Sequence, residues 1–164
     1  MAEPVVNTAS LQLRFEALED LQTVPGASSP QVLNDDFNWD LLQLTPTTTP
    51  PVARASYQEY TIGGGGTVDI DLFALASTQG TIAGNGMKLQ LLVINNTAAA
   101  SINVAPGASN AYSPFGASND VDIPAGAKLA LYVPEVLADI SSTVRNIRIT
   151  GTSTHIVEVG IWIG

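Results

Sequence analysis

The chain has 164 residues, of which only 13% are charged, and its six basic and fifteen acidic residues give a formal net charge of -9. Nucleic acid and anionic membranes are bound through basic surfaces, so neither is expected as a partner, and a basic protein surface suits the chain better. Without cysteine, the chain has no disulfides and no thiolate chemistry.

The first residues of the chain do not predict export or membrane insertion. Residues 1–10 lack a basic stretch followed by an apolar core. No uninterrupted apolar run approaches the roughly 18 residues of a membrane span. We therefore expect a soluble protein.

The low share of charged residues has two interpretations. Soluble domains typically carry about 25% charged residues, roughly twice the share found here. Either neighbouring subunits cover part of the surface, or the surface is built from uncharged Ser, Thr, Asn and Gln. At the level of composition both interpretations stay open.

Residues 1–56 are predicted to form an acidic arm that begins with a short helix. Up to Glu59 the chain has eight acidic and two basic residues, and after it seven and four. Four apolar residues fall at spacings of four, three and three: Leu11, Phe15, Leu18 and Leu21. This spacing is typical of one face of an amphipathic helix, which residues 24–26 (Val-Pro-Gly) would end.

The second half of the arm interleaves apolar residues with Asn and Asp. Its most prominent apolar members are Phe37, Trp39, Leu41 and Leu42. Such a segment needs a surface to bury these residues against, either its own body or a neighbouring subunit. The Pro and Thr run at 45–51 that follows favours extended geometry and indicates a spacer.

Residues 57–164 are predicted to form a separate β domain, because the apolar period changes from about 3.6 to two. Gly, Pro and Asn separate about eight short strands, expected at 57–62, 68–72, 88–94, 102–104, 121–123, 129–133, 144–150 and 157–163. The short helix candidate at 71–77, or a turn near 135–139, is too short for a parallel crossover. We therefore expect a mainly β fold, an antiparallel two-sheet sandwich and most simply a jelly roll.

No catalytic or metal site is predicted, and no cofactor is expected. His155 is the only histidine, and neither a second histidine nor a nucleophile elbow accompanies it. Asp69 and Asp71 lie two apart on an expected strand, which permits a shared carboxylate pair for glycoside chemistry or for calcium. The simpler interpretation is that both carboxylates lie on the solvent-exposed face of the strand. Asn119, Asp120 and Asp122 offer calcium ligands, but their loop lacks the dense oxygen-ligand pattern of an EF-hand.

Exposed aromatic residues offer a different class of function. A sugar-binding surface could be lined by Tyr57 and Tyr60, by Tyr112 and Phe115, or by Trp162, although packing at the edge of the core is the simpler explanation. A carbohydrate-binding module is therefore one alternative to a purely structural role, and a glycosidase built on the two aspartates is another.

The body also resembles a known group of proteins. The resemblance rests on the strand and turn sequences at 88–97, 104–112, 123–131 and 144–150, taken in this order, and covers roughly 57–164. In this pattern the chain is similar to the small β-sandwich proteins encoded among the head genes of tailed bacteriophages, including decoration or cement proteins. The arm has no counterpart in the resemblance.

The resemblance implies a non-enzymatic virion protein on the capsid surface. It implies binding to the major capsid protein, commonly as a homotrimer, after a soluble stage in the host cytoplasm. Combined with the apolar arm, this leads to the hypothesis that burial of arm residues against neighbouring subunits stabilises a shell. A tail, fibre or other appendage subunit would have the same composition and stays an alternative.

Overall fold

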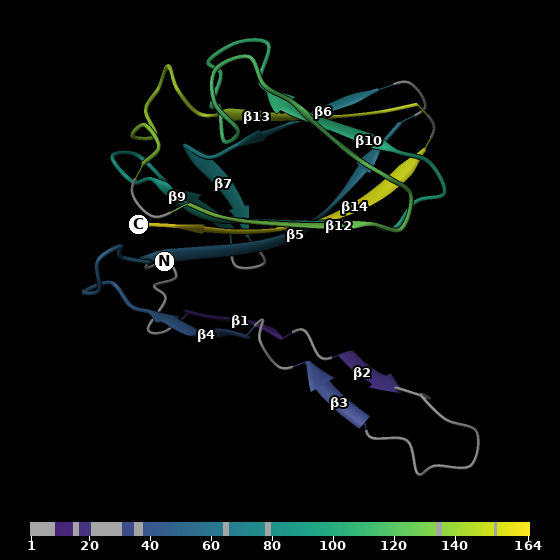
Figure 1. The fold of residues 1–164 in the computed structure, drawn as a ribbon. Helices are drawn as coiled ribbons and strands as arrows, with labels where there is room; N and C mark the ends of the chain where they lie inside the picture. The colour runs from purple at the N-terminus through teal and green to yellow at the C-terminus, as the bar shows by residue number, and fades with distance from the viewer. Residues whose placement is uncertain are drawn as a thin grey trace. The chain divides into compact units, whose positions relative to one another are not determined.

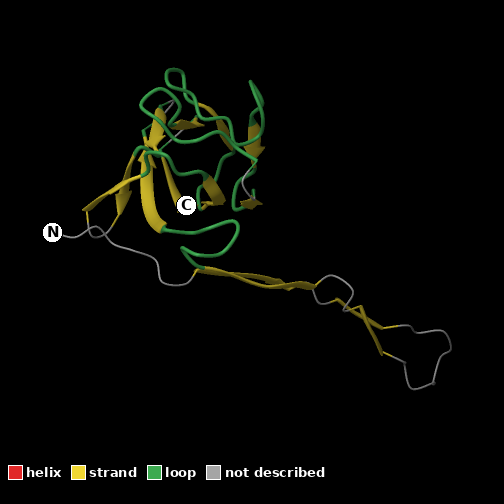
Figure 2. Ribbon diagram, turned by 90° about the vertical axis from the view of Figure 1, so that its left-hand side faces the viewer, coloured by secondary structure: helices red, strands yellow, loops and turns green. Residues whose placement is uncertain are grey.

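The protein is mainly β and divides into two compact units. The computed structural model describes residues 9–14, 17–20, 31–34, 38–63, 66–77, 80–133, 136–152 and 154–164. Within these ranges it contains fourteen strands and no helix (Figure 2). One unit is Ala9–Gln43, and the other includes all the described residues from Leu44 to Gly164. The expectation of a mainly β protein with antiparallel sheets is confirmed.

The first unit, called the ribbon below, consists of two-stranded sheets. Strand β1 (Ala9–Arg14) is hydrogen-bonded to β4 (Asn38–Leu44). Between them in the sequence, β2 (Ala17–Asp20) pairs antiparallel with β3 (Gln31–Asn34). The chain thus nests one strand pair inside another.

The amphipathic helix expected near the N-terminus is wrong for the described residues, because Ala9–Arg14 and Ala17–Asp20 are strands. The apolar spacing from Leu11 to Leu21 also fits a strand locally, since Leu11 and Leu13 alternate with Gln12 and Arg14. A helix this short is marginal without packing, whereas pairing with a distant strand satisfies the backbone groups directly.

The second unit, called the body, contains two four-stranded sheets that Figure 1 shows as two layers. One sheet has the order β11-β10-β13-β6 and the other β12-β9-β14-β5. The strands are β5 (Arg54–Ile62), β6 (Thr67–Asp71), β7 (Ala74–Ser77), β8 (Gly80–Ala83), β9 (Leu89–Asn96), β10 (Ile102–Pro106), β11 (Val121–Ile123), β12 (Lys128–Tyr132), β13 (Asn146–Gly151) and β14 (His155–Ile163).

The pairing of these strands follows a nested plan. The first and last strands of the body, β5 and β14, pair with each other, as do β6 with β13, β9 with β12, and β10 with β11. Contacts of β14 with β9 and of β10 with β13 complete the sheets. Every one of these pairings is antiparallel, so the body is one long hairpin of four strand pairs folded into two layers.

A hairpin of β7 and β8 interrupts this plan between β6 and β9. The segment 71–77, the short helix candidate, is therefore a strand from Ala74 onward. The hairpin is tied to β5 near the beginning of that strand, since the hydroxyl of Ser56 donates to the carbonyl of Ala76.

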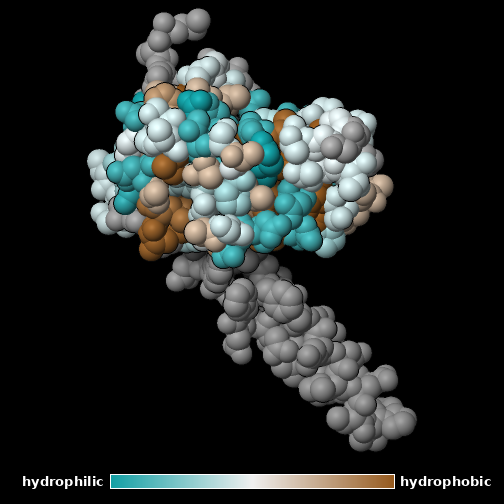
Figure 3. Space-filling view, turned by 90° about the horizontal axis from the view of Figure 1, so that it is seen from above, coloured by the Kyte–Doolittle hydropathy of each residue, from teal (hydrophilic) through white to brown (hydrophobic). Residues whose placement is uncertain are grey.

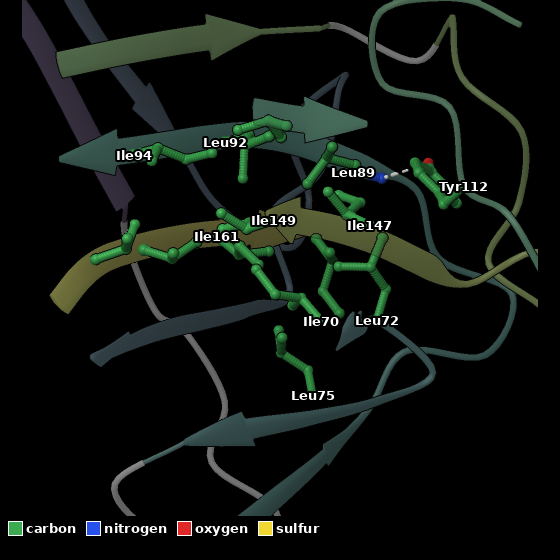
Figure 4. Close-up of a cluster of buried hydrophobic side chains, with 14 of the residues drawn as sticks. Ile70, Leu72, Leu75, Leu89, Leu92, Ile94, Tyr112, Ile147, Ile149 and Ile161 are labelled. Carbon is green, nitrogen blue, oxygen red and sulfur yellow. Dashed lines mark hydrogen bonds between the residues drawn. The ribbon is translucent and has the colours of Figure 1, made fainter. Parts of the chain in front are cut away.

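Alternating residues of the two layers form a single core. In β13, Ile147 and Ile149 are fully buried while Arg148 between them is only partly buried. Both layers contribute to one cluster, which Figure 4 shows with Ile70 and Ile149 from one sheet and Leu92 and Ile161 from the other. Each such side chain stabilises the fold by about 1.5–3 kcal/mol relative to exposure.

Tyr112 fastens a long loop to this core. Its side chain is 1% exposed, and its hydroxyl accepts a hydrogen bond from the backbone N–H of Leu89 at 3.1 Å (Figure 4). The same hydroxyl donates to the carbonyl of Ala138 at 2.9 Å. A buried tyrosine hydroxyl needs such hydrogen-bond partners. Tyr112 therefore holds the loop between β10 and β11 against the beginning of β9.

The Pro and Thr run before β5 is a closed loop rather than an extended spacer. The carbonyl of Thr45 accepts hydrogen bonds from the N–H groups of Thr48 and Val52, at 3.3 and 3.0 Å. The hydroxyl of Thr48 donates to the same carbonyl at 2.9 Å. Threonine hydroxyls compete locally for backbone groups, which the expectation from proline alone did not include.

Candidate interaction surfaces

The arm residues expected at an interface lie on the ribbon where they are described. Leu11 is in β1, Leu18 in β2, and Trp39, Leu41 and Leu42 in β4. Leu18 stands opposite Leu33 across the β2–β3 pair. Phe15, Leu21 and Phe37 lie outside the described residues. The pairing therefore collects these apolar positions on one ribbon.

The carboxylates considered for glycoside chemistry are engaged in separate ion pairs. Asp69 receives two hydrogen bonds from Arg148, both at 2.8 Å. Asp71 lies 3.6 Å from Arg145 and accepts the backbone N–H of Phe73 at 2.9 Å. The guanidinium of Arg148 holds the pKa of Asp69 below its usual range. In a shared acid–base pair one carboxyl must stay protonated. The ion pair with Arg148 instead favours the ionised form of Asp69.

The acidic residues near 119–122 are also accounted for by local contacts. The amide nitrogen of Asn103 donates to both Asp120 and Asp122, each at 2.8 Å. The amide of Asn119 donates to the carbonyl of Phe115 at 3.0 Å. No group of three or more histidine, cysteine, aspartate or glutamate residues suited to a metal ion occurs in the part of the chain that the structure describes.

Most of the aromatic residues proposed for sugar binding are not gathered on one surface: Tyr57 is exposed, but Tyr60 packs partly buried against the core. Tyr112 is buried, and Phe115 packs partly buried against the core. Trp162, half-buried, alternates with the core residues Ile161 and Ile163 of β14. His155 begins the same strand, opposite Ile62. Tyr112 is therefore corrected from a surface residue to a core residue, because its hydroxyl finds two backbone partners inside.

The outer face of the sheet β11-β10-β13-β6 is called the paired face below. Its outward positions include Thr67, Asp69, Asn103, Asp122 and Arg148. Each charged group among them has a partner of opposite charge or an amide donor. Figure 3 views the body from the side of this sheet, where hydrophilic and intermediate residues predominate. These contacts indicate a solvated face whose charged groups are ion-paired or hydrogen-bonded locally.

The outer face of the sheet β12-β9-β14-β5 is called the open face, and its charges are arranged differently. Glu59 of β5 stands directly opposite Glu158 of β14. Glu158 accepts a hydrogen bond of 2.6 Å from the amide of Asn95. The carboxylate of Glu59 has no hydrogen-bond or ion-pair partner among the described residues. Directly opposed like charges destabilise a strand pair.

Two large apolar residues border this carboxylate pair. Tyr57 is 57% exposed and Ile156 is 50% exposed, and among the residues of the body whose exposure is described only one other large hydrophobic residue, Val136, is exposed. Partial desolvation, together with the charge of Glu158, a hydrogen bond to it and the charge of Glu59, raises the pKa of Tyr57. The phenol therefore stays protonated beside the carboxylates at neutral pH.

The open face was not predicted from the sequence. The alternation in 57–62 and 157–163 places Glu59 and Glu158 on the polar side of their strands, and this part of the signal is present. Which strands are neighbours, and in what register, depends on contacts between the two ends of the body. No local pattern contains that information.

Comparison with models of known protein families and with curated protein sequences finds no match to this chain. Among the residues described, no helix has the length and apolar character needed to cross a membrane.

Proposed function

We propose that this chain is a structural adhesion protein of a virion: a decoration or cement protein that binds the outer surface of a capsid. The observation that supports it is the ribbon, which forms a compact unit of its own from two-stranded sheets alone. Its partners are then the major capsid protein and other copies of the chain, most simply in a trimer.

A two-stranded ribbon is poorly suited to stand alone in water. Isolated hairpins are marginally stable at best, and independent stability takes a third strand or a packed layer. Each ribbon strand has a single strand neighbour in the described chain, which leaves one edge of hydrogen-bonding groups for another partner. Docking on a neighbouring subunit supplies both the missing layer and the missing edge.

The residue types of the ribbon supply the energy for such docking. Leu11, Leu18 and Trp39 each contribute about 1.5–3 kcal/mol when fully buried, before ordering costs are subtracted. The unit Ala9–Gln43 also has the size of one side of a standard interface, which takes about 20–30 residues. Repeated at many positions of a shell, this contact would hold neighbouring capsid subunits together.

The body fits a rigid platform for the ribbon. We propose that it is a two-sheet sandwich of the jelly-roll type, because its sheets carry the strands in the orders first-eighth-third-sixth and second-seventh-fourth-fifth when β7 and β8 are set aside. Jelly rolls build many capsid and lectin domains. The fold alone does not decide between these uses, so the ribbon carries the argument.

Deletion of residues 1–43 tests the proposal. The shortened chain is expected to keep a cooperative thermal unfolding transition, because the body has its own core. Its mass by sedimentation is expected to fall to that of one chain. It is also expected to stop cosedimenting with virus particles purified from the producing host, which the full chain decorates.

Two variants distinguish specific binding through the ribbon from non-specific hydrophobic adsorption. Trp39→Ser with Leu41→Ser removes apolar surface from the ribbon and is expected to weaken cosedimentation at least tenfold. Val136→Ser, at a residue of the body that is 76% exposed, serves as the matched control and is expected to bind normally. Normal decoration by the shortened chain would refute the proposal. Immunogold labelling of tails instead of heads would reassign it to an appendage subunit.

A further inference from the structure

We propose that the open face is a second docking surface, which takes a basic segment of a partner protein. An arginine or lysine side chain of the partner lies along Tyr57 and places its charged end between Glu59 and Glu158. This inference deepens the proposed function, since it names the chemistry of the partner's surface that the body contacts.

The carboxylate pair is the first observation behind this proposal. Glu59 and Glu158 are directly opposed across β5 and β14, where their Cβ atoms are about 4.5–5.5 Å apart. The only cation in the same row is Lys128, which is separated from Glu158 by the intervening strand β9. It makes no ion pair with either carboxylate. Among the described residues, the two opposed carboxylates therefore have no cation paired with either of them.

The exposed apolar residues on both sides are the second observation. Tyr57 and Ile156 flank the two carboxylates, and both are at least half exposed. Long basic side chains combine an apolar stem with a charged end, so this combination of surfaces fits them. The ring of Tyr57 adds a cation–π contact to the charge attraction. A guanidinium also has the planar donors that bind carboxylates in pairs.

A second copy of the chain is a weaker occupant of this surface. Arg145 and Arg148 of the body already bind Asp71 and Asp69. With a net charge of -9, two copies also repel each other wherever their acidic surfaces approach. Charge complementarity therefore favours a basic partner of different sequence.

The test uses the full chain and a fluorescein-labelled peptide of alternating arginine and alanine, followed by fluorescence anisotropy. The same peptide with citrulline in place of arginine keeps the shape and removes the charge. The full chain is expected to bind the arginine peptide at least tenfold more tightly than the citrulline peptide. Equal binding of both peptides, or no binding of the arginine peptide, would overturn the proposal.

Matched variants locate the binding. E59Q with E158Q is expected to weaken binding of the arginine peptide about tenfold. Y57A is expected to weaken it about two- to fivefold. The control D120N with D122N makes the same change in net charge on the paired face and is expected to change binding less than twofold. If the two double variants weaken binding equally, net charge alone attracts the peptide and the open face is not the site.

Thermal unfolding and sedimentation of E59Q supply readouts that do not depend on the peptide. Relief of the opposed charges is expected to raise the melting temperature by about 1–2 °C. A lower melting temperature would show that the pair is not repulsive and would refute the argument. A change in the oligomeric mass on E59Q with E158Q would show that the occupant is a second copy, which also overturns it.

The two proposals fail separately. A chain that decorates particles through its ribbon but ignores the arginine peptide refutes the docking surface alone. A chain that binds the peptide at the open face but decorates particles normally without residues 1–43 refutes the ribbon mechanism alone.

Discussion

The two outer faces of the body are built from the same kind of sheet but differ in how their charged side chains are paired. On the paired face, Asp69 and Arg148 stand opposite each other in β6 and β13 and share two hydrogen bonds. On the open face, the equivalent cross-strand position pairs Glu59 with Glu158. Both arrangements rest on the same core, so packing does not dictate the difference.

The two faces therefore differ in whether their charged side chains stabilise the isolated chain. The pair on the paired face contributes to stability in the isolated chain, and Arg145 adds to it by lying over the ring of Phe73 at 5.6 Å from its centroid. Because like charges directly opposed across a strand pair are unfavourable, the opposed glutamates are expected to lower the stability of the isolated chain. A surface arrangement that costs stability in isolation is explained most simply by a contact made in an assembly.

The largest expected effect comes from reversing the charge at the paired face. Asp69→Lys removes the two hydrogen bonds to Arg148 and places a second cation opposite it. The melting temperature is expected to fall by about 3–6 °C, measured by circular dichroism. The control Asp69→Asn removes the pair without adding a cation and should cause a smaller fall. Equal falls in melting temperature for the two variants would show that repulsion between cations across this strand pair does not affect stability.

The mirror-image change at the open face is expected to have the opposite sign. Glu59→Lys places a cation opposite Glu158 and converts the repulsion into an ion pair like that of the paired face. The melting temperature is expected to rise by about 2–4 °C. Glu59→Gln, as control, should raise it less. If Glu59→Lys destabilises the chain, the two faces do not differ in the way described.

Much of the body could be predicted from the sequence, because its signals are local. Alternation such as Val157, Val159, Ile161 and Ile163 fixes which residues of a strand enter the core, and all four are buried. Strands occur at each of the eight expected places. The β7–β8 hairpin was missed, since its four-residue strands are too short for alternation to distinguish them from a helical turn.

The arm shows where local signals become ambiguous. The spacing of Leu11 and Leu18 fits a helix, but the partner strands that decide the matter lie further along the chain. The partner of β1, β4, begins 24 residues after β1 ends (38 − 14), and Leu33 follows Leu18 by 15 residues (33 − 18). Candidate sites behave likewise. The sequence correctly places Asp69 and Asp71 on the polar side of a strand, but their neutralisation by Arg148 and Arg145 depends on β13, far along the chain. Non-local register therefore limits prediction at both the fold and the surface.

The smallest effect concerns the pH dependence of the paired face. Arg148 lowers the pKa of Asp69 in the folded chain below the value of about 3.9 that an unfolded aspartate has. The stabilisation from this pair is therefore fully present above about pH 4 and is lost as the pH falls through the lowered pKa. The difference in melting temperature between the natural chain and Asp69→Asn should shrink accordingly as the pH falls below about 4.

A second background tests the cause of this pH dependence. In a chain that carries Arg148→Gln, the group that lowers the pKa of Asp69 is gone. Replacing Asp69 by Asn in that background should then change stability by an amount that depends much less on pH over the same range. A pH dependence that survives the loss of Arg148 would show that Asp69 is stabilised by its strand rather than by its partner. The ion pair of the paired face would then stabilise the chain less than its geometry indicates. The two faces would also differ less in how their charges affect stability.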